Sequence, residues 1–287
     1  MRILIGYNGS DAAKAALEDL RNAGFPSETE AIVFTVAEAW LPPTTPDDAH
    51  TIAAAGKSAL DSYFPTWTVK AETASGSPPR EILARAESFE PDLIIVGEPR
   101  QPIGQHNMFI GHTSQIILTE AGCSVRIARG RVINTPAAKI LVGFDGSAGA
   151  LHIVDSIASR VWPANTQVRL LAVADSSVLG MIGRFTPQMK DATVEAKFAL
   201  QWAKTLAAAS LEKLARCGIS SSIEVRLGHP KYEIIEEAQS WKADAIFVGP
   251  HCAPNSFERF LIGSVSIAVA SQAPCSVEVV RKSTERR

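Results

Sequence analysis

A loop in the second half of the chain carries the residues best suited to bind an anion. This segment, 248–265, leaves an apolar run at Gly249 and reaches Gly263 and Ser264, where a helical pattern begins. Backbone amides at a helix N-terminus attract anions, and glycine lets a phosphate approach the backbone closely. Loops with two glycines and a serine are common, so this segment alone is a weak signal for phosphate binding.

An acidic residue stands at a second position of chemical interest. Asp145 lies in the stretch LVGFDGSAGA at 141–150, and the similar stretch LIGYNGSDAA at 4–13 has Asn8 in its place. A carboxylate here could contact a ligand. It could equally accept a hydrogen bond inside the turn that leads into the next helix, and Asn8 can do the same. Both interpretations stay open at this stage.

The thiols and imidazoles give weaker signals. Cys252 follows His251, but adjacent residues rarely form a nucleophile and its base, so we interpret Cys252 as an ordinary loop residue. Cys123 and Cys275 precede two apolar runs and are expected to pack in the core. No group of His, Cys, Asp and Glu has the spacing of metal ligands, so no metal site is expected.

The sequence contains an internal repeat, which determines how these residues are positioned. Ile3 aligns with Ile140, 137 positions further on, and Val36 aligns with Val173 at the same offset. Beyond the first two strands the offset becomes 152. At this offset, 91–97 matches 243–249, 109–116 matches 261–268, and 122–129 matches 274–281. We therefore expect one domain duplicated, at 1–130 and 138–281, with 129–138 as the linker.

Each half alternates short apolar runs with helical patterns, which is typical of parallel strands joined by crossover helices. The predicted strands are 2–8, 30–37, 67–73, 92–97 and 124–128, then 138–144, 166–173, 221–227, 244–249 and 276–280. The predicted fold is α/β, with two tandem open five-stranded parallel sheets and helices on both faces of each.

Several residues mark where the helices begin and end. Ser10 and Ser147 are predicted to cap helix N-termini, and Gly218 to end a long helix in the left-handed conformation. Trp202 and Leu206 share one face of that helix with Phe198.

Composition excludes some classes of function. The chain has 287 residues, 20% of them charged, and a formal net charge of −2. This balance gives no electrostatic reason to expect nucleic acid or a membrane surface as a partner. No apolar run approaches the roughly 20 residues that span a bilayer, and the N-terminus leaves no room for a signal peptide. Four scattered cysteines favour a reduced, cytoplasmic protein.

Taken in order, the motifs resemble the universal stress protein family. They are ILVGFDGS, LLAVADSS, GHPKYEII, DAIFVGPHC and FLIGSVSIAVASQAPCSVEVVR, which together run through most of 138–281. Residues 1–130 resemble the same family more weakly, so the chain is similar to a tandem member. The resemblance implies a five-stranded Rossmann-like sheet in each half and pairing through the last strand. Some members of the family bind ATP and others do not.

The resemblance also implies a set of ligand-binding residues in the second half. ATP-binding members have an Asp after the first strand, a small apolar residue at the end of the second, and a glycine-rich loop that ends in Gly-Ser. The matching residues here are Asp145, Val173, Gly249, Gly263, Ser264 and Val265. The implied cofactor is ATP or another adenine nucleotide, with Mg²⁺ held through its phosphates.

The middle of the loop departs from the family pattern. Cys252 stands where the second glycine belongs, the loop is one residue longer, and Pro250 has no N–H to donate. Loss of one hydrogen bond to a charged group costs roughly 1.5–3 kcal/mol, which weakens binding about ten- to a hundredfold. A longer loop could restore the geometry, so nucleotide binding in this half stays open.

The first half departs further from the pattern. Asn8 replaces the Asp, Glu98 follows Gly97, and His112 replaces the Ser. Glu98 would bring a negative charge beside the phosphates. We expect no ATP in the first half, so that only one copy of the repeat keeps a ligand.

Two functions remain. The first is a non-enzymatic stress-response protein that binds an adenine nucleotide in its second half. The alternative is a nucleotide-free scaffold that acts through its surfaces and its dimer. An enzyme is not expected, because FDGSAG lacks the SGGxDS-type loop of adenylating enzymes and no general base accompanies Ser264. We also expect the edges of the last strands, 124–128 and 276–280, to meet. The segment 181–190 is expected to pack on the long helix. A protein partner is expected, but its identity is unknown.

Overall fold

The computed structural model describes the chain apart from residues 39–44, 100–109, 131–136, 175–191, 251–261 and 283–287, and apart from the side chains of 192–200. The linker between Gly130 and Ala137, the segment 181–190 and Cys252 therefore lie outside the described residues.

All ten strands of the described residues form one continuous sheet, in the order β3-β2-β1-β4-β5-β10-β9-β6-β7-β8. The first half supplies β1 (Arg2–Gly6), β2 (Glu30–Ala37), β3 (Thr68–Ser75), β4 (Leu93–Gly97) and β5 (Ser124–Ala128). The second supplies β6 (Lys139–Gly143), β7 (Gln167–Ala174), β8 (Ser220–Leu227), β9 (Ala245–Val248) and β10 (Ser276–Val279). These bounds confirm the predicted strands to within about two residues.

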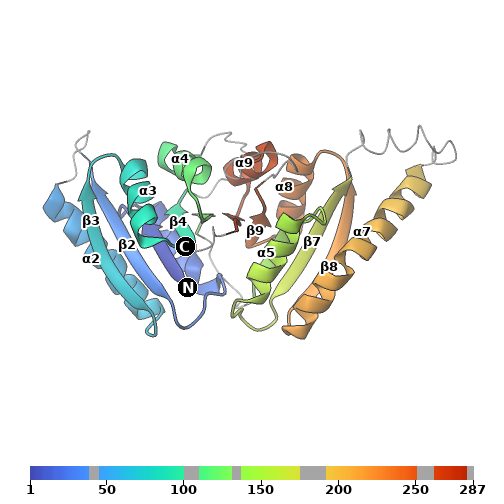
Figure 1. Ribbon diagram of the computed structural model, residues 1–287, viewed down its shortest axis with the longest axis horizontal. Helices are drawn as coiled ribbons and strands as arrows, with labels where there is room; N and C mark the ends of the chain where they lie inside the picture. The colour runs from blue at the N-terminus through green and yellow to red at the C-terminus, as the bar shows by residue number, and fades with distance from the viewer. Residues whose placement is uncertain (39–44, 100–109, 131–136, 175–191, 251–261, 283–287) are drawn as a thin grey trace.

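Helices cover both faces of the sheet (Figure 1). They are α1 (Asp11–Asp19), the short 3-10 helix η1 (Leu20–Asn22), α2 (Pro46–Tyr63), α3 (Pro78–Phe89), α4 (His112–Glu120), α5 (Ala148–Ala158), α7 (Ala192–Arg216), α8 (Pro230–Ser240) and α9 (Ser264–Gln272). Alternate side chains of a strand point to opposite faces, so Leu4 packs in one core and Ile3 and Ile5 in another. The α/β fold with parallel strands in each half is confirmed.

The cores on the two faces differ in extent. On the face of α3, α4, α8 and α9, one hydrophobic cluster runs across both halves and includes Ile117 and Val269. On the face of α1, α2, α5 and α7, each half has a cluster of its own, around Leu17 in the first and Ile153 in the second. The two halves therefore share a core on only one face of the sheet.

The two halves meet at β5 and β10, which pair antiparallel, whereas every other strand pair in the sheet is parallel. The prediction that these two edges meet is confirmed. The pairing removes two open edges, which would otherwise expose unpaired backbone groups. In Figure 1 the halves lie side by side about a near-vertical axis, with α4 and α9 close to that axis.

The helix boundaries follow the predicted signals. The hydroxyls of Ser10 and Ser147 accept hydrogen bonds from Ala13 and Ala150, each at 3.2 Å, so both serines are N-caps. Helix α7 ends before Gly218, whose φ of +73° is the left-handed conformation. Trp202 lies on α7 but is 52% exposed, so its part of the helix face is not buried in the core.

Candidate functional site

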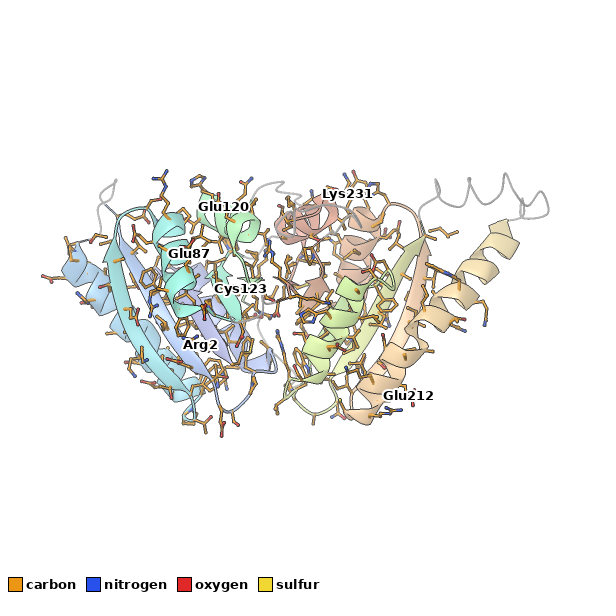
Figure 2. All side chains as sticks on the ribbon, viewed as in Figure 1. Arg2, Glu87, Glu120, Cys123, Glu212 and Lys231 are labelled. Carbon is orange, nitrogen blue, oxygen red and sulfur yellow. The ribbon has the colours of Figure 1, made fainter. Side chains whose placement is uncertain are left out.

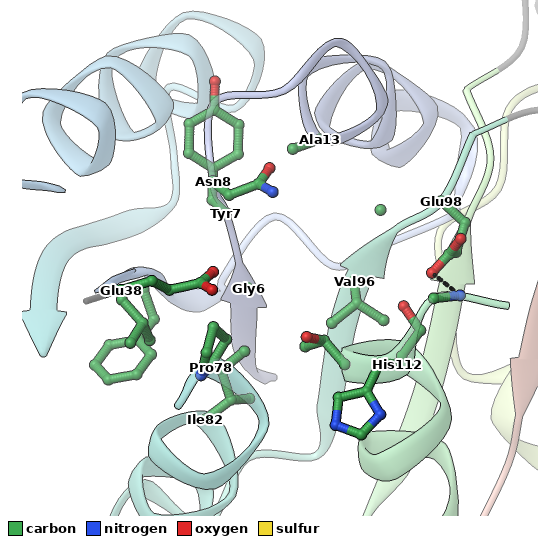
Figure 3. A pocket seen from close by; sticks show the side chains of 16 residues that line it. Gly6, Tyr7, Asn8, Ala13, Glu38, Pro78, Ile82, Val96, Glu98 and His112 are labelled. Atoms are coloured by element: carbon green, nitrogen blue, oxygen red, sulfur yellow. Dashed lines mark hydrogen bonds between the residues drawn. The ribbon is translucent and has the colours of Figure 1, made fainter. Parts of the chain in front are cut away.

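A pocket lies at the carboxyl ends of β1 and β4 in the first half, where open α/β sheets bind ligands (Figure 3). Its volume is about 230 Å³. Its walls come from the ends of β1, β2 and β4 and from the starts of α1, α3 and α4. The sequence predicted a site at this edge of the sheet but assigned the ligand to the other half.

Glu98 occupies the anion-binding end of α4 in this pocket. Gly111 is the N-cap of α4, and its N–H donates to Oε1 of Glu98 at 3.0 Å (Figure 3). The partial positive charge of the helix N-terminus is thus matched by a carboxylate of the chain itself. A phosphate at this position would have to displace Glu98 and would meet its negative charge.

A second carboxylate lines the pocket beside Glu98. Glu38 points into it from the end of β2 (Figure 3). Asn8 uses its side-chain oxygen to accept a hydrogen bond from the N–H of Ser10 at 3.2 Å. The described residues that line the pocket include Glu38 and Glu98 but neither lysine nor arginine. Its electrostatics therefore oppose a polyphosphate.

Asp145 sits in the same turn of the second half as Asn8 does in the first. The Asp145 carboxylate accepts a hydrogen bond from the N–H of Ser147 at 2.9 Å, and the residue is exposed. Gly146 and Gly9 follow with φ of +74° and +73°. The turn thus uses the side-chain oxygen in both halves, and among the described residues no hydrogen bond is made to the second carboxylate oxygen of Asp145.

The start of α9 differs from the start of α4. Gly263 is the N-cap of α9, and no side chain within the described residues caps this helix. Ser264, which is exposed, is the first helical residue and therefore is not the N-cap. The hydroxyl of Ser266 donates to the carbonyl of Gly249 at 2.7 Å and ties the helix start to the end of β9.

The residue that matches Glu98 in the second half is Pro250. Gly97 aligns with Gly249, so the next position is Glu98 in one half and Pro250 in the other. Proline has no charge to place at a helix N-terminus. At equivalent helix starts, the first half therefore has a carboxylate, whereas the described residues of the second half place none.

The two glycines that end the matched strands are constrained differently. A Cβ at Gly97 would lie 2.9 Å from the carbonyl oxygen of Ala12, so packing alone requires glycine there. A Cβ at Gly249 would lie 3.7 Å from its nearest described neighbour, Ile153, which is ordinary contact. Packing against the described residues gives no reason for glycine at 249, and close approach of a ligand is a reason that remains.

The remaining predicted site residues lie around this helix start. Val173 is half-buried near the end of β7, and Val265 is half-buried in the first turn of α9. Both pack against the core cluster shared by the two halves. The structure brings Gly249 close to the first turn of α9, with Gly263, Ser264 and Val265. Asp145 and Val173 lie at the ends of the neighbouring strands β6 and β7.

Sequence reasoning placed Glu98 beside the phosphate position but missed its hydrogen bond to Gly111. The signal was present, since a carboxylate directly after a strand can reach the facing helix start. It also missed Ser266, because a serine inside a helix gives no indication of a bond to a distant carbonyl.

Two of the three cysteines that the structure describes lie in the core, and Cys217 is exposed. Cys123 and Cys275 are buried, as predicted, and Cys123 lies toward the middle of the molecule (Figure 2). Burial raises the pKa of the Cys123 thiol to about 11, which leaves it protonated and unreactive at neutral pH. In the described part of the chain, no three His, Cys, Asp or Glu side chains are grouped to hold a metal ion.

The universal stress protein family model matches the chain twice, over residues 1–129 and 137–281. The chain therefore belongs to this family. Both copies of the repeat are matched, so the chain is a tandem member.

The solved structures with the same fold include two of similar length. A universal stress protein from Archaeoglobus fulgidus DSM 4304 is 17% identical, with a TM-score of 0.65 over 99% of this chain and 97% of that one. A functionally unknown protein from Pseudomonas aeruginosa PAO1 is also 17% identical, with a TM-score of 0.63 over 98% and 92%. No curated protein matches the chain at a significant level. Among the described residues, no helix is both long and apolar enough to cross a membrane.

Proposed function

We propose that this tandem universal stress protein acts without catalysis in the stress response and binds an adenine nucleotide in its second half only. The observation that carries this proposal is the contrast between two equivalent helix starts. Glu98 fills the N-terminus of α4, whereas α9 has Pro250 at the matching position and no described side chain as its cap.

The contrast matters because a helix N-terminus is an anion site only if nothing else fills it. The amides of the first turn of α9 and the positive end of its dipole are suited to a phosphate group. At α4 the same groups already face a carboxylate. The second half is therefore the better site for a polyanion.

The second-half residues fit a nucleotide in position and chemistry. Phosphates would lie against the backbone of Gly263, Ser264 and Val265, and Gly249 would allow their close approach. Asp145 would use its second carboxylate oxygen for the ribose side of the ligand, and the Val173 backbone would face adenine. Bound Mg²⁺ would be held through the phosphates, since the described residues offer no cluster of metal ligands.

Placing a carboxylate at the start of α9 tests the proposal. Pro250→Glu gives the second half the side chain that fills the helix start in the first. Loss of about one charge-assisted hydrogen bond predicts at least roughly tenfold weaker binding. The measurement is calorimetric titration of nucleotide-stripped protein with ATP and Mg²⁺. Pro250→Gln is the matched control, because it changes the backbone and side-chain length in the same way without adding charge.

If Pro250→Glu and Pro250→Gln bind ATP as tightly as the unchanged protein, the nucleotide does not lie at the start of α9. If only Pro250→Glu is weakened, the charge at this position is responsible.

A second candidate function is a nucleotide-free scaffold. The observation that favours it is that Asp145 makes the same turn as Asn8, so its retention does not require a ligand. In that case the unchanged protein gives no heat with ATP and carries no nucleotide through purification. The scattered cysteines support our assignment of either function to the cytoplasm.

A further inference from the structure

The junction between β5 and β10, which we call the seam, pairs equivalent residues of the repeat. Arg126 faces Glu278, and these two residues are 152 positions apart, as equivalent residues are in this part of the repeat. The local twofold axis between the halves therefore passes between them. If two first halves paired in this way, Arg126 would face a second Arg126, and two second halves would oppose Glu278 to Glu278.

One set of seam contacts is symmetric and cannot distinguish partners. The N–H of Arg129 donates to Ser276 Oγ at 2.9 Å, and the N–H of Arg281 donates to Ser124 Oγ at 3.0 Å. Each guanidinium also donates to carbonyl oxygens near the end of α9 or α4 in the facing half. Like halves could form all of these bonds equally well.

A second set of contacts is asymmetric and consists of buried charges. Arg126 lies 2.7 Å from Asp19 and 3.4 Å from Glu278, and Glu278 also bonds Arg160. All four side chains are buried. Along the seam the charges alternate in the order Asp19, Arg126, Glu278, Arg160. Two like halves would break this alternation and bring two buried guanidiniums, or two buried carboxylates, face to face.

The outer members of the series have uncharged equivalents in the other half. Asp19 matches Ser156, and Arg160 matches Ala23, at the offset of 137. Each reaches across the seam. Ser276 donates to Asp19 at 2.9 Å, and Arg160 donates to the carbonyl of Ala23 at 3.2 Å. A pair of second halves would lack the Asp19 carboxylate of the first bond, and a pair of first halves would lack the Arg160 guanidinium of the second.

Packing beside the charges is asymmetric as well. Gly24 has φ of +69°, and a Cβ there would lie 2.5 Å from the ring of Trp162 in the other half. The equivalent of Gly24 in the second half is Val161. Two second halves would therefore press Val161 against Trp162, where the seam has no room for a Cβ.

From these observations we propose that the seam selects an unlike partner. The β5 edge of a first half pairs with the β10 edge of a second half and does not pair with the β5 edge of another first half. Likewise, the β10 edge of a second half does not pair with the β10 edge of another second half. The partner of each edge is the other half of the same chain, or the complementary half of a second copy. The symmetric contacts hold the seam together, and the charge series with the Gly24–Trp162 contact determines which halves join.

The test compares two full-length variants of opposite design. The first variant gives the first half the charged seam residues of the second half, so that like faces like; its substitutions are Asp19→Ser, Ala23→Arg and Arg126→Glu. The second variant adds the reciprocal changes and so exchanges the two sides; these are Ser156→Asp, Arg160→Ala and Glu278→Arg. Gly24 and Trp162 stay unchanged in both variants. Hydrogen exchange at the amides of β5 and β10 reports on the seam, and exchange at β1 and β6 reports on the halves.

In the like-faced variant we expect at least about tenfold faster exchange at β5 and β10, with protection kept at β1 and β6. The exchanged variant, although it carries twice as many substitutions, should recover protection at the seam. A like-faced variant with full protection would overturn the proposal. So would an exchanged variant no better protected than the like-faced one, including the case in which both are unfolded.

Discussion

At the scale of single residues, one position accounts for most of the difference between the two candidate sites. Glu98 and Pro250 are equivalent, yet one places a carboxylate on a helix N-terminus and the other cannot. Asn8 and Asp145 differ in charge but make the same turn. The charge of Asp145 is therefore weaker support for a ligand than the lack of a carboxylate at the start of α9 among the described residues.

Two substitutions distinguish the role of Asp145 in the turn from its proposed role in binding the ligand. Asp145→Asn keeps the acceptor that Asn8 uses and should change the free energy of unfolding by less than about 0.5 kcal/mol. Asp145→Ala removes the acceptor and should cost roughly 1 kcal/mol. Denaturant unfolding measures both. If the carboxylate binds the nucleotide, both variants weaken ATP binding in calorimetry; if Asp145→Asn binds normally, only the turn matters.

The buried thiol of Cys123 gives a prediction about pH. Its pKa is raised from 9.0 to about 11 by burial, so the folded state favours the protonated thiol. That contribution to stability is fully present below pH 9 and is lost as pH rises toward 11, up to about 2–3 kcal/mol.

The measurement is the free energy of unfolding of the unchanged protein and of Cys123→Ala between pH 8 and pH 11. The alanine variant should show a shallower fall in this range. Equal slopes for the two proteins would contradict the prediction.

At the scale of elements, the two serines at helix starts should behave differently. Ser147 caps α5 through its hydroxyl, so Ser147→Ala should lower the free energy of unfolding by about 1 kcal/mol. Ser264 begins α9 without capping it, so Ser264→Ala should change stability by less than about 0.5 kcal/mol. We expect the exposed Ser264 hydroxyl to donate to a phosphate beside the backbone amides, so its loss should instead weaken ATP binding. Loss of stability in Ser264→Ala without loss of binding would reverse this assignment.

Most elements could be predicted from the sequence because their signals are local. Apolar runs predicted the strands, and the hydroxyls of Ser10 and Ser147 predicted two helix starts. The bond from Glu98 to Gly111 could not be predicted in the same way, because it joins two elements across a pocket. The exposure of Trp202 likewise depends on what packs beside α7 and not on its spacing along the helix.

At the scale of the whole molecule, duplication has joined two sheets into one. The repeat was visible in the sequence, and the resemblance to the family implied that the last strands pair, but nothing indicated the charge series across the seam. Asp19, Arg126, Arg160 and Glu278 are far apart in the chain, and no local pattern links them. Only the register of β5 against β10 shows that they meet in the interior. With the halves held in this way, their two sites could diverge independently.

The most direct test of the account is the stoichiometry of ATP binding to the full, nucleotide-stripped chain with Mg²⁺, measured by calorimetry. The account predicts about one nucleotide per chain, unchanged in Glu98→Gln and weakened in Pro250→Glu. Two nucleotides per chain would show that Glu98 does not prevent nucleotide binding in the first half. No binding would show that the second half has lost its nucleotide site as well.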